Sequence, residues 1–152
     1  MTGARAAGAR RLDRAGIRAL QAALAAEQAA AYGYGVVGSH LHGAQAESAV
    51  ADWGTHQAAA DQLNGILAAA GISGTPAGVA YQLPAAVRTP AQAAALAATL
   101  EEQVTSAYLD LVAHGEPEQR MLGAQQARGA ALRAARWRGS TVAFPGLPAP
   151  GR

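Results

Sequence analysis

The chain has 152 residues, which is the size of one domain. Hydrophobic residues make up 51% and 43 residues are Ala, a strong helix former that is uncommon in strands, so the composition excludes a β-sandwich or β-barrel. The absence of Cys excludes disulfide scaffolds and thiolate metal sites.

The net charge is +2, and all twelve basic residues are Arg. Most of them lie in two stretches, near the N-terminus and in the last helical segment, with no recognition motif and no interleaved aromatic residues. We therefore expect solvated helix faces and no nucleic-acid binding. Arg10-Arg11 resembles the start of a twin-Arg signal peptide, but charged residues follow where such a peptide would be apolar. The apolar stretch 20–38 is long enough to raise the question of a transmembrane helix, but Glu27 and Gln28 interrupt it. We expect a cytoplasmic protein without a membrane span.

Residues 1–12 are an Arg-, Ala- and Gly-rich stretch that we expect to be flexible. A first helix is predicted from Asp13, a plausible N-cap, to a stop at His42-Gly43. Residues spaced by three and four along it form one face that packs on a partner. These residues are Leu20, Leu24, Glu27, Ala31, Tyr34, Gly38 and Leu41.

A second helix is predicted over 46–70, ended by Gly71. Its inner face is expected to be Ala49, Trp53, His56, Ala60, Leu63, Leu67 and Ala70. Residues 72–89 contain several Gly and Pro and show no helical period. Extended, they could reach about 60 Å, more than the roughly 36 Å of a 24-residue helix. This connection can therefore run the length of the helices, and the alternation of Val79, Tyr81 and Leu83 suits a strap laid on them.

A third helix is predicted from Thr89-Pro90 to His114, and a fourth follows the turn at Gly115 and runs to Arg138. The tail 139–152 is expected to pack on the helices through Phe144 and Leu147. Residues 13–138 thus predict an all-α four-helix bundle in which a long crossover joins two antiparallel hairpins.

Two carboxylates lie on the predicted inner faces, Glu27 on the first helix and Glu101 on the third. Seven residues after each comes a Tyr on the same face, Tyr34 and Tyr108, so the two pairs are offset by 74 residues. Matching Gln28 to Gln103 would give 75 instead. We prefer 74, because it places Tyr on Tyr, and it suggests an internal repeat of the hairpin.

In an antiparallel hairpin, residues at one level are equidistant from the turn. Glu27 and His56 are equidistant from residues 41 and 42, so His56 is expected to face Glu27. In the second hairpin the residue opposite Glu101 is Ala130. The two hairpins are therefore expected to match in length but to differ in chemistry.

The Glu-x6-Tyr pattern on two helices resembles the ferritin-like superfamily of ferritins, bacterioferritins and rubrerythrins. The chain is most similar to an actinobacterial ferritin-like family of unknown function. This likeness rests on residues 20–38, residues 53–71 and the end from Arg136-Trp137-Arg138-Gly139 to Phe144-Pro145-Gly146. The resemblance implies a ferritin-like bundle that forms a homodimer.

Di-iron members of that superfamily use a Glu from each of two helices and Glu-x-x-His from each of the other two. Glu27 and Glu101 match the single Glu positions, and His56 matches one His. The remaining three ligand positions hold Trp53, Ala127 and Ala130. The resemblance therefore implies no cofactor or a single divalent metal, iron or manganese, on Glu27, His56 and Glu101, with Tyr34 and Tyr108 bonded around it.

Glu27 and His56 have a simpler interpretation as a buried ion pair, with a Tyr donating to a carboxylate. Asp52 and His56 are spaced as a helix pair, and His40, His42 and His114 lie where they would bond terminal carbonyls. No catalytic residue is identified, and no phosphate loop or nucleophile motif occurs. We expect a ferritin-like domain protein of unknown activity, non-catalytic, with an eroded metal site. The alternative is a metal-dependent oxidoreductase.

Overall fold

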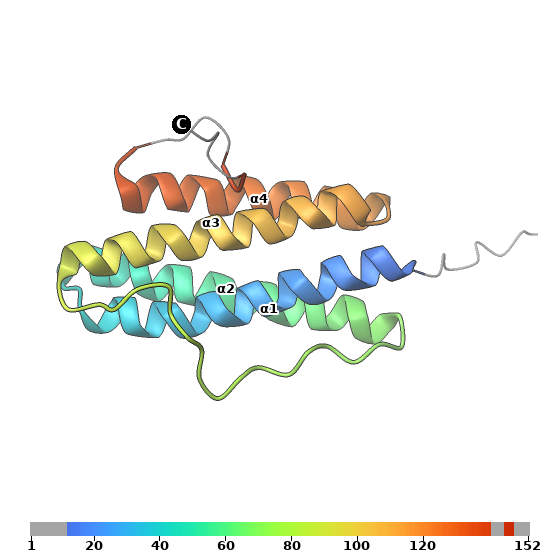
Figure 1. Cartoon of the computed structure of the whole chain (residues 1–152), viewed down its shortest axis with the longest axis horizontal. Coiled ribbons are helices and arrows are strands. Elements are labelled where there is room, and N and C mark those ends of the chain that lie inside the picture. Colours follow the sequence, from blue (N-terminus) through green and yellow to red (C-terminus); the bar gives the residue numbers. More distant parts are fainter. Residues whose placement is uncertain (1–11, 141–144, 148–152) are drawn as a thin grey trace, which may run out of the picture.

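The computed structural model describes residues 12–140 and 145–147 (Figure 1). Four helices account for most of this part: α1 (Arg14–Ser39), α2 (Gly43–Ala69), α3 (Pro90–His114) and α4 (Pro117–Arg138). The described ranges contain no strand, so the all-α prediction is confirmed. Within the same ranges, none of the helices is both long enough and apolar enough to cross a membrane. The expected N-terminal lead, apart from its last residue, and Phe144 lie outside the described residues.

The helices form two antiparallel hairpins, α1–α2 and α3–α4, stacked on each other (Figure 1). The hairpins meet through α1 and α3, which pack closely together, while α2 packs on α1 and α4 packs on α3. The two hairpin turns lie at opposite ends of the bundle, and the crossover between α2 and α3 runs along its length (Figure 1). This is the arrangement that the long connection predicted.

Local signals in the sequence explain three of the helix ends. The Asp13 carboxylate accepts a hydrogen bond from the Gly16 N–H at 2.6 Å and caps α1. Thr89 accepts one from the Gln92 N–H at 3.2 Å, directly before Pro90 in the first turn of α3. Gly139 closes α4 in the left-handed conformation with φ 73°.

The first hairpin turn differs from the prediction. α1 ends at Ser39 instead of His42, and α2 begins three residues before the expected start, at Gly43. Gly43 has a φ of 56°, so its left-handed conformation serves the entry to α2 and does not end α1. His40 caps α1, and its Nδ1 lies 2.9 Å from the Val36 carbonyl oxygen, as expected for a His at a helix end.

The inner face of α2 also differs. Ala49, His56, Leu63 and Leu67 are buried as predicted. Trp53 is 41% exposed, and Ala60 and Ala70 are not buried either, whereas Asp52 and Ala59 are. The buried face continues three residues after Ala49, at Asp52, and three residues after His56, at Ala59. The sequence pattern predicts steps of four residues at both places. Asp52 can lie inside because α1 and α4 provide hydrogen-bond donors for its carboxylate.

The crossover and the tail pack less closely than expected. Tyr81 and Leu83 are partly buried, but Val79 is fully exposed, so the alternation continues only in part. Gly146 packs directly against Thr105 and Ser106 of α3, so that a Cβ there would lie 2.7 Å from a Thr105 methyl. Leu147, expected to anchor the tail, is 59% exposed.

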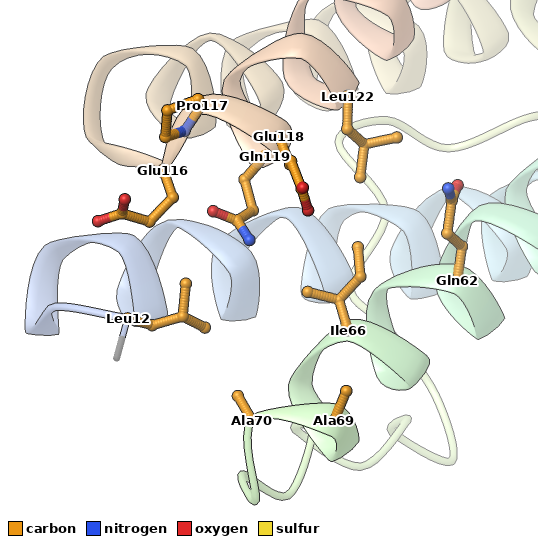
Figure 2. A pocket seen from close by; sticks show the side chains of 10 residues that line it. All are labelled: Leu12, Gln62, Ile66, Ala69, Ala70, Glu116, Pro117, Glu118, Gln119 and Leu122. Carbon is orange, nitrogen blue, oxygen red and sulfur yellow. The ribbon is translucent and has the colours of Figure 1, made fainter. Parts of the chain in front are cut away.

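The two outer helices stay apart: no Cα atom of α2 lies within 8 Å of one in α4. Toward the C-terminal end of α2, an open groove of about 740 Å³ lies between them (Figure 2). Ile66 of α2 and Leu122 of α4 point toward each other across it, with Leu12 at its outer end. At the other end of the bundle, side chains of α2 and α4 meet through Asp52.

Candidate functional site

The three residues singled out from the sequence lie together in the core. Glu27 of α1, His56 of α2 and Glu101 of α3 are each buried to within 1% exposure. His56 Nδ1 lies 2.5 Å from Glu27 Oε2, and His56 Nε2 lies 3.1 Å from Glu101 Oε1. The imidazole therefore links the two hairpins through a carboxylate on each side. The expectation that His56 faces Glu27 across the hairpin is confirmed.

The two tyrosines bond crosswise between the hairpins. The Tyr34 hydroxyl of α1 donates to Glu101 Oε1 of α3 at 2.8 Å and lies 3.3 Å from Asp52 Oδ2. Tyr108 of α3 is hydrogen-bonded to Glu27 of α1. Burial, followed by the nearby carboxylates, raises the pKa of both phenols, so both stay protonated and act as donors.

This reciprocity fits the offset of 74 residues. Glu27 with Tyr34 and Glu101 with Tyr108 occupy equivalent places and exchange hydrogen bonds. Glu102, the residue that the offset of 75 would have used, is partly exposed and pairs with Arg138. The offset of 74 residues, which aligns Tyr34 with Tyr108, is confirmed.

Sequence reasoning missed three residues of α4. Arg133 Nε donates to Glu101 Oε1 at 2.8 Å, and the Arg133 side chain is only 14% exposed. Trp137 Nε1 donates to Asp52 Oδ2 at 2.8 Å, and Arg136 pairs with the same oxygen. The expectation of a solvated basic face on this helix is wrong for Arg133. The signal available in the sequence was the small size of Ala130 and Ala134, three residues before it and one after, because small neighbours leave room for a long side chain.

The centre is a compensated set of charges, in which three carboxylic side chains meet three cationic ones. Burial lowers the pKa of His56, but hydrogen bonds to Glu101 and Glu27 and their charges outweigh it and raise the pKa to about 9. His56 is therefore an imidazolium at neutral pH, and both ring nitrogens donate. Burial raises the pKa of Glu101, but hydrogen bonds from His56 and Arg133 bring it below its ordinary value.

The donor set fits a metal ion poorly in this arrangement. Both nitrogens of His56 are engaged with carboxylates, so neither offers a lone pair. Glu101 Oε1 already has three polar partners, whereas Glu101 Oε2 is buried with none. Across the described ranges, no three His, Asp or Glu side chains are arranged to hold a metal. Ala127 and Ala130, buried on α4, supply no ligand atom.

The comparisons place the chain in a family. Residues 19–149 match the model of a domain of unknown function, DUF4439. The chain belongs to this family. This DUF4439 match spans all four helices apart from residues 14–18 of α1. It confirms that the sequence resembles a family of unknown function.

A solved structure supports the fold of this DUF4439 chain. The crystal structure of a conserved hypothetical protein, rv2844, from Mycobacterium tuberculosis is similar, with a TM-score of 0.80 and 31% sequence identity. The match covers 82% of this chain and 96% of that one. No curated protein matches the chain. The described helices and this neighbour agree on a four-helix bundle.

Proposed function

We propose that this DUF4439 chain is a non-catalytic ferritin-like domain protein, in which a network of side-chain charges stands where related bundles hold metal. The observation that carries the proposal is the His56 imidazolium held between Glu27 and Glu101. Those two Glu residues match the single-Glu ligand positions of di-iron members. In this chain, both carboxylates are bonded to cationic or hydrogen-bond-donating side chains of the protein itself.

The energetic argument concerns what a buried carboxylate needs. An unpaired ionised carboxylate in the core costs several kcal/mol, so it must be paired or must bind a metal. Glu101 is paired with His56 and Arg133. Asp52 is paired with Arg136 and accepts from the Trp137 indole. With cations supplied by the protein, the centre has no remaining need for a dication, and the network joins all four helices.

On this proposal the chain binds at most one divalent ion, and we expect it to bind none. A metal on Glu27, His56 and Glu101 must displace the His56 protons, because an imidazolium is not a ligand. A second ion would also require a carboxylate and an imidazole on α4, where Ala127 and Ala130 stand. Arg133 beside Glu101 adds electrostatic repulsion against any dication placed there.

Metal content tests this proposal. Protein purified without chelators and without a His-tag should carry between zero and one equivalent of iron or manganese by elemental analysis. Any metal that does bind should be lost in His56→Ala, because His56 provides the one imidazole of the centre. Two equivalents of iron with the absorption band of an oxo-bridged pair would contradict the proposal.

The alternative function is a metal-dependent oxidoreductase using iron or manganese. The observation in its favour is Glu101 Oε2, a buried carboxylate oxygen without a hydrogen-bond partner. If that atom awaits a metal, Mn²⁺ should bind more tightly as the pH approaches 9, where His56 loses its proton. Titration of Mn²⁺ at pH 7 and pH 9 separates the two functions, because a metal-dependent oxidoreductase must bind the ion tightly at pH 7, whereas the charge network allows at most one weakly bound ion there.

We further propose that the protein is a cytoplasmic homodimer. The support for the dimer is the resemblance to paired ferritin-like bundles and the exposure of large apolar residues on α4, Met121 and Leu132. Light scattering coupled to size exclusion should give twice the chain mass. A monomer, or a particle of cage size, would contradict the dimer.

A further inference from the structure

A recess of about 500 Å³ lies outside the buried charge network, between α1, α2 and the crossover. Tyr32 of α1, Trp53 of α2 and Tyr81 of the crossover line it, and we call it the aromatic recess. The chain has only seven aromatic residues of the Phe, Trp and Tyr type, and three of them meet here. Such a gathering on the surface of a protein poor in aromatics points to a ligand.

Two of the three aromatic side chains in the recess are exposed to solvent. Trp53 is 41% exposed and Tyr32 is 38% exposed, although both side chains carry large apolar surfaces. The Tyr32 and Tyr81 rings are tilted by 50° with their centroids 5.5 Å apart, so they form two adjoining walls. The helical spacing of the sequence predicts that Trp53 is buried. Its outward position adds an indole to the recess.

The crossover wall is held in place by polar contacts with α1. Gln21 Oε1 accepts hydrogen bonds from the backbone N–H and the hydroxyl of Thr75, at 2.8 and 2.7 Å. Gln28 Nε2 donates to the Thr75 carbonyl oxygen at 2.9 Å. Farther along, the Gly78 N–H donates to the Tyr81 hydroxyl at 2.8 Å and orients its ring. The recess is therefore formed before any ligand arrives, which lowers the entropic cost of binding.

The electrostatics of the recess select the charge of the ligand. Asp61 is the one charged residue among those that line it, and no Arg lines it. The Asp61 carboxylate has no ion pair with any described residue and is exposed to solvent. Aromatic faces carry a negative quadrupole and attract cations that are weakly hydrated. An anionic ligand would be repelled by Asp61, and a neutral apolar ligand would leave its charge unused.

We propose that the aromatic recess binds an organic cation that carries a quaternary ammonium group, with Tyr32, Trp53 and Tyr81 around the cation and Asp61 as its counter-charge. The site does not depend on the metal content of the core, because none of these four residues contacts Glu27, His56 or Glu101 in a hydrogen bond or ion pair. The proposal can fail or succeed separately from the proposed function.

Nuclear magnetic resonance on the full chain tests the site with tetramethylammonium and choline as probes. The chain has two Trp residues, so two indole N–H signals report on it. The Trp53 signal should shift saturably in the millimolar range, while the signal of Trp137, bonded to Asp52 in the core, should stay in place. The neutral isostere of choline, 3,3-dimethylbutanol, should bind at least about fivefold more weakly, as expected for loss of the cation–π term.

Matched variants complete the test. Asp61→Asn should weaken choline binding by about threefold to fivefold, as for an exposed charge pair, while Asp110→Asn, an exposed carboxylate on α3, should leave it unchanged. Tyr81→Leu should weaken binding by about fivefold, while Val50→Ala, an exposed apolar change on α2, should have no effect. Equal binding of choline and its neutral isostere, or a Trp53 signal that neither cation moves, would overturn the proposal.

Discussion

The two hairpins use the same frame for different chemistry. α1 and α3 each bring a buried Glu and, seven residues later, a buried Tyr. Their partner helices differ, because α2 contributes Asp52 and His56 whereas α4 contributes Arg133 and Trp137. The repeat therefore explains where the carboxylates lie. The charges that stabilise them come from α2 and α4, whose inward-facing residues differ between the two hairpins.

This difference makes the two equivalent carboxylates unequal. Glu27 bonds to His56 and Tyr108, whereas Glu101 Oε1 bonds to His56, Tyr34 and Arg133. The second hairpin is also packed more closely, because Gly123 of α4 lies against the backbone of α3 at Tyr108. By contrast, Gly54 and Gly65 of α2 face open space.

The largest effects should come from the two buried carboxylates. Glu101→Ala should lower the free energy of unfolding by about 4 kcal/mol and Glu27→Ala by about 3 kcal/mol, because each leaves a buried cation or donor without its partner. Chemical denaturation monitored by circular dichroism measures both. Glu102→Ala, a surface pair with Arg138, is the control and should cost less than about 0.5 kcal/mol. A Glu27 effect as small as the control would show that the charges in the core do not depend on one another.

The link through His56 should appear as a dependence of stability on pH. The folded pKa of about 9 lies above the ordinary value of 6.5, so the stabilisation is complete below pH 6.5 and is lost as the pH rises through 9. The loss should be on the order of 3 kcal/mol. Thermal melts at half-unit pH steps measure it. His56→Gln should melt lower at pH 6 and should lack this alkaline decline; an identical decline in the variant would assign it to other groups.

The closer packing of the second hairpin should appear at glycines. A Cβ at Gly123 would lie 2.9 Å from the Tyr108 carbonyl oxygen, so Gly123→Ala should force α3 and α4 apart and cost about 2 kcal/mol. Gly65→Ala on α2 meets nothing and should stabilise the protein by about 0.5–1 kcal/mol through helix propensity. Melting temperatures of the two variants should therefore move in opposite directions. A shift of the same sign would contradict the difference in packing.

Much of the core could be predicted because helical spacing and hairpin symmetry are local rules. Glu27, Tyr34, Glu101 and Tyr108 follow from spacing, and His56 follows from its distance to the turn. Asp52 and Trp53 could not be told apart, since α2 can step by three or by four residues and a partner helix decides which. Arg133 was missed for a related reason. Whether a long charged side chain points inward depends on a carboxylate supplied 32 residues earlier.

The packing order of the four helices also determines how the bundle can unfold locally. α1 and α3 are inner helices with two helical neighbours, while α2 and α4 each lean on one. We therefore expect amide hydrogen exchange to be slowest in α1 and α3, and either outer helix to detach as a unit. Asp52 connects those outer helices through Arg136 and Trp137, so detachment of one exposes the anchor of the other. We therefore expect the outer helices to stay connected at the end that holds Asp52 and to separate first at the other end, where the groove lies between them.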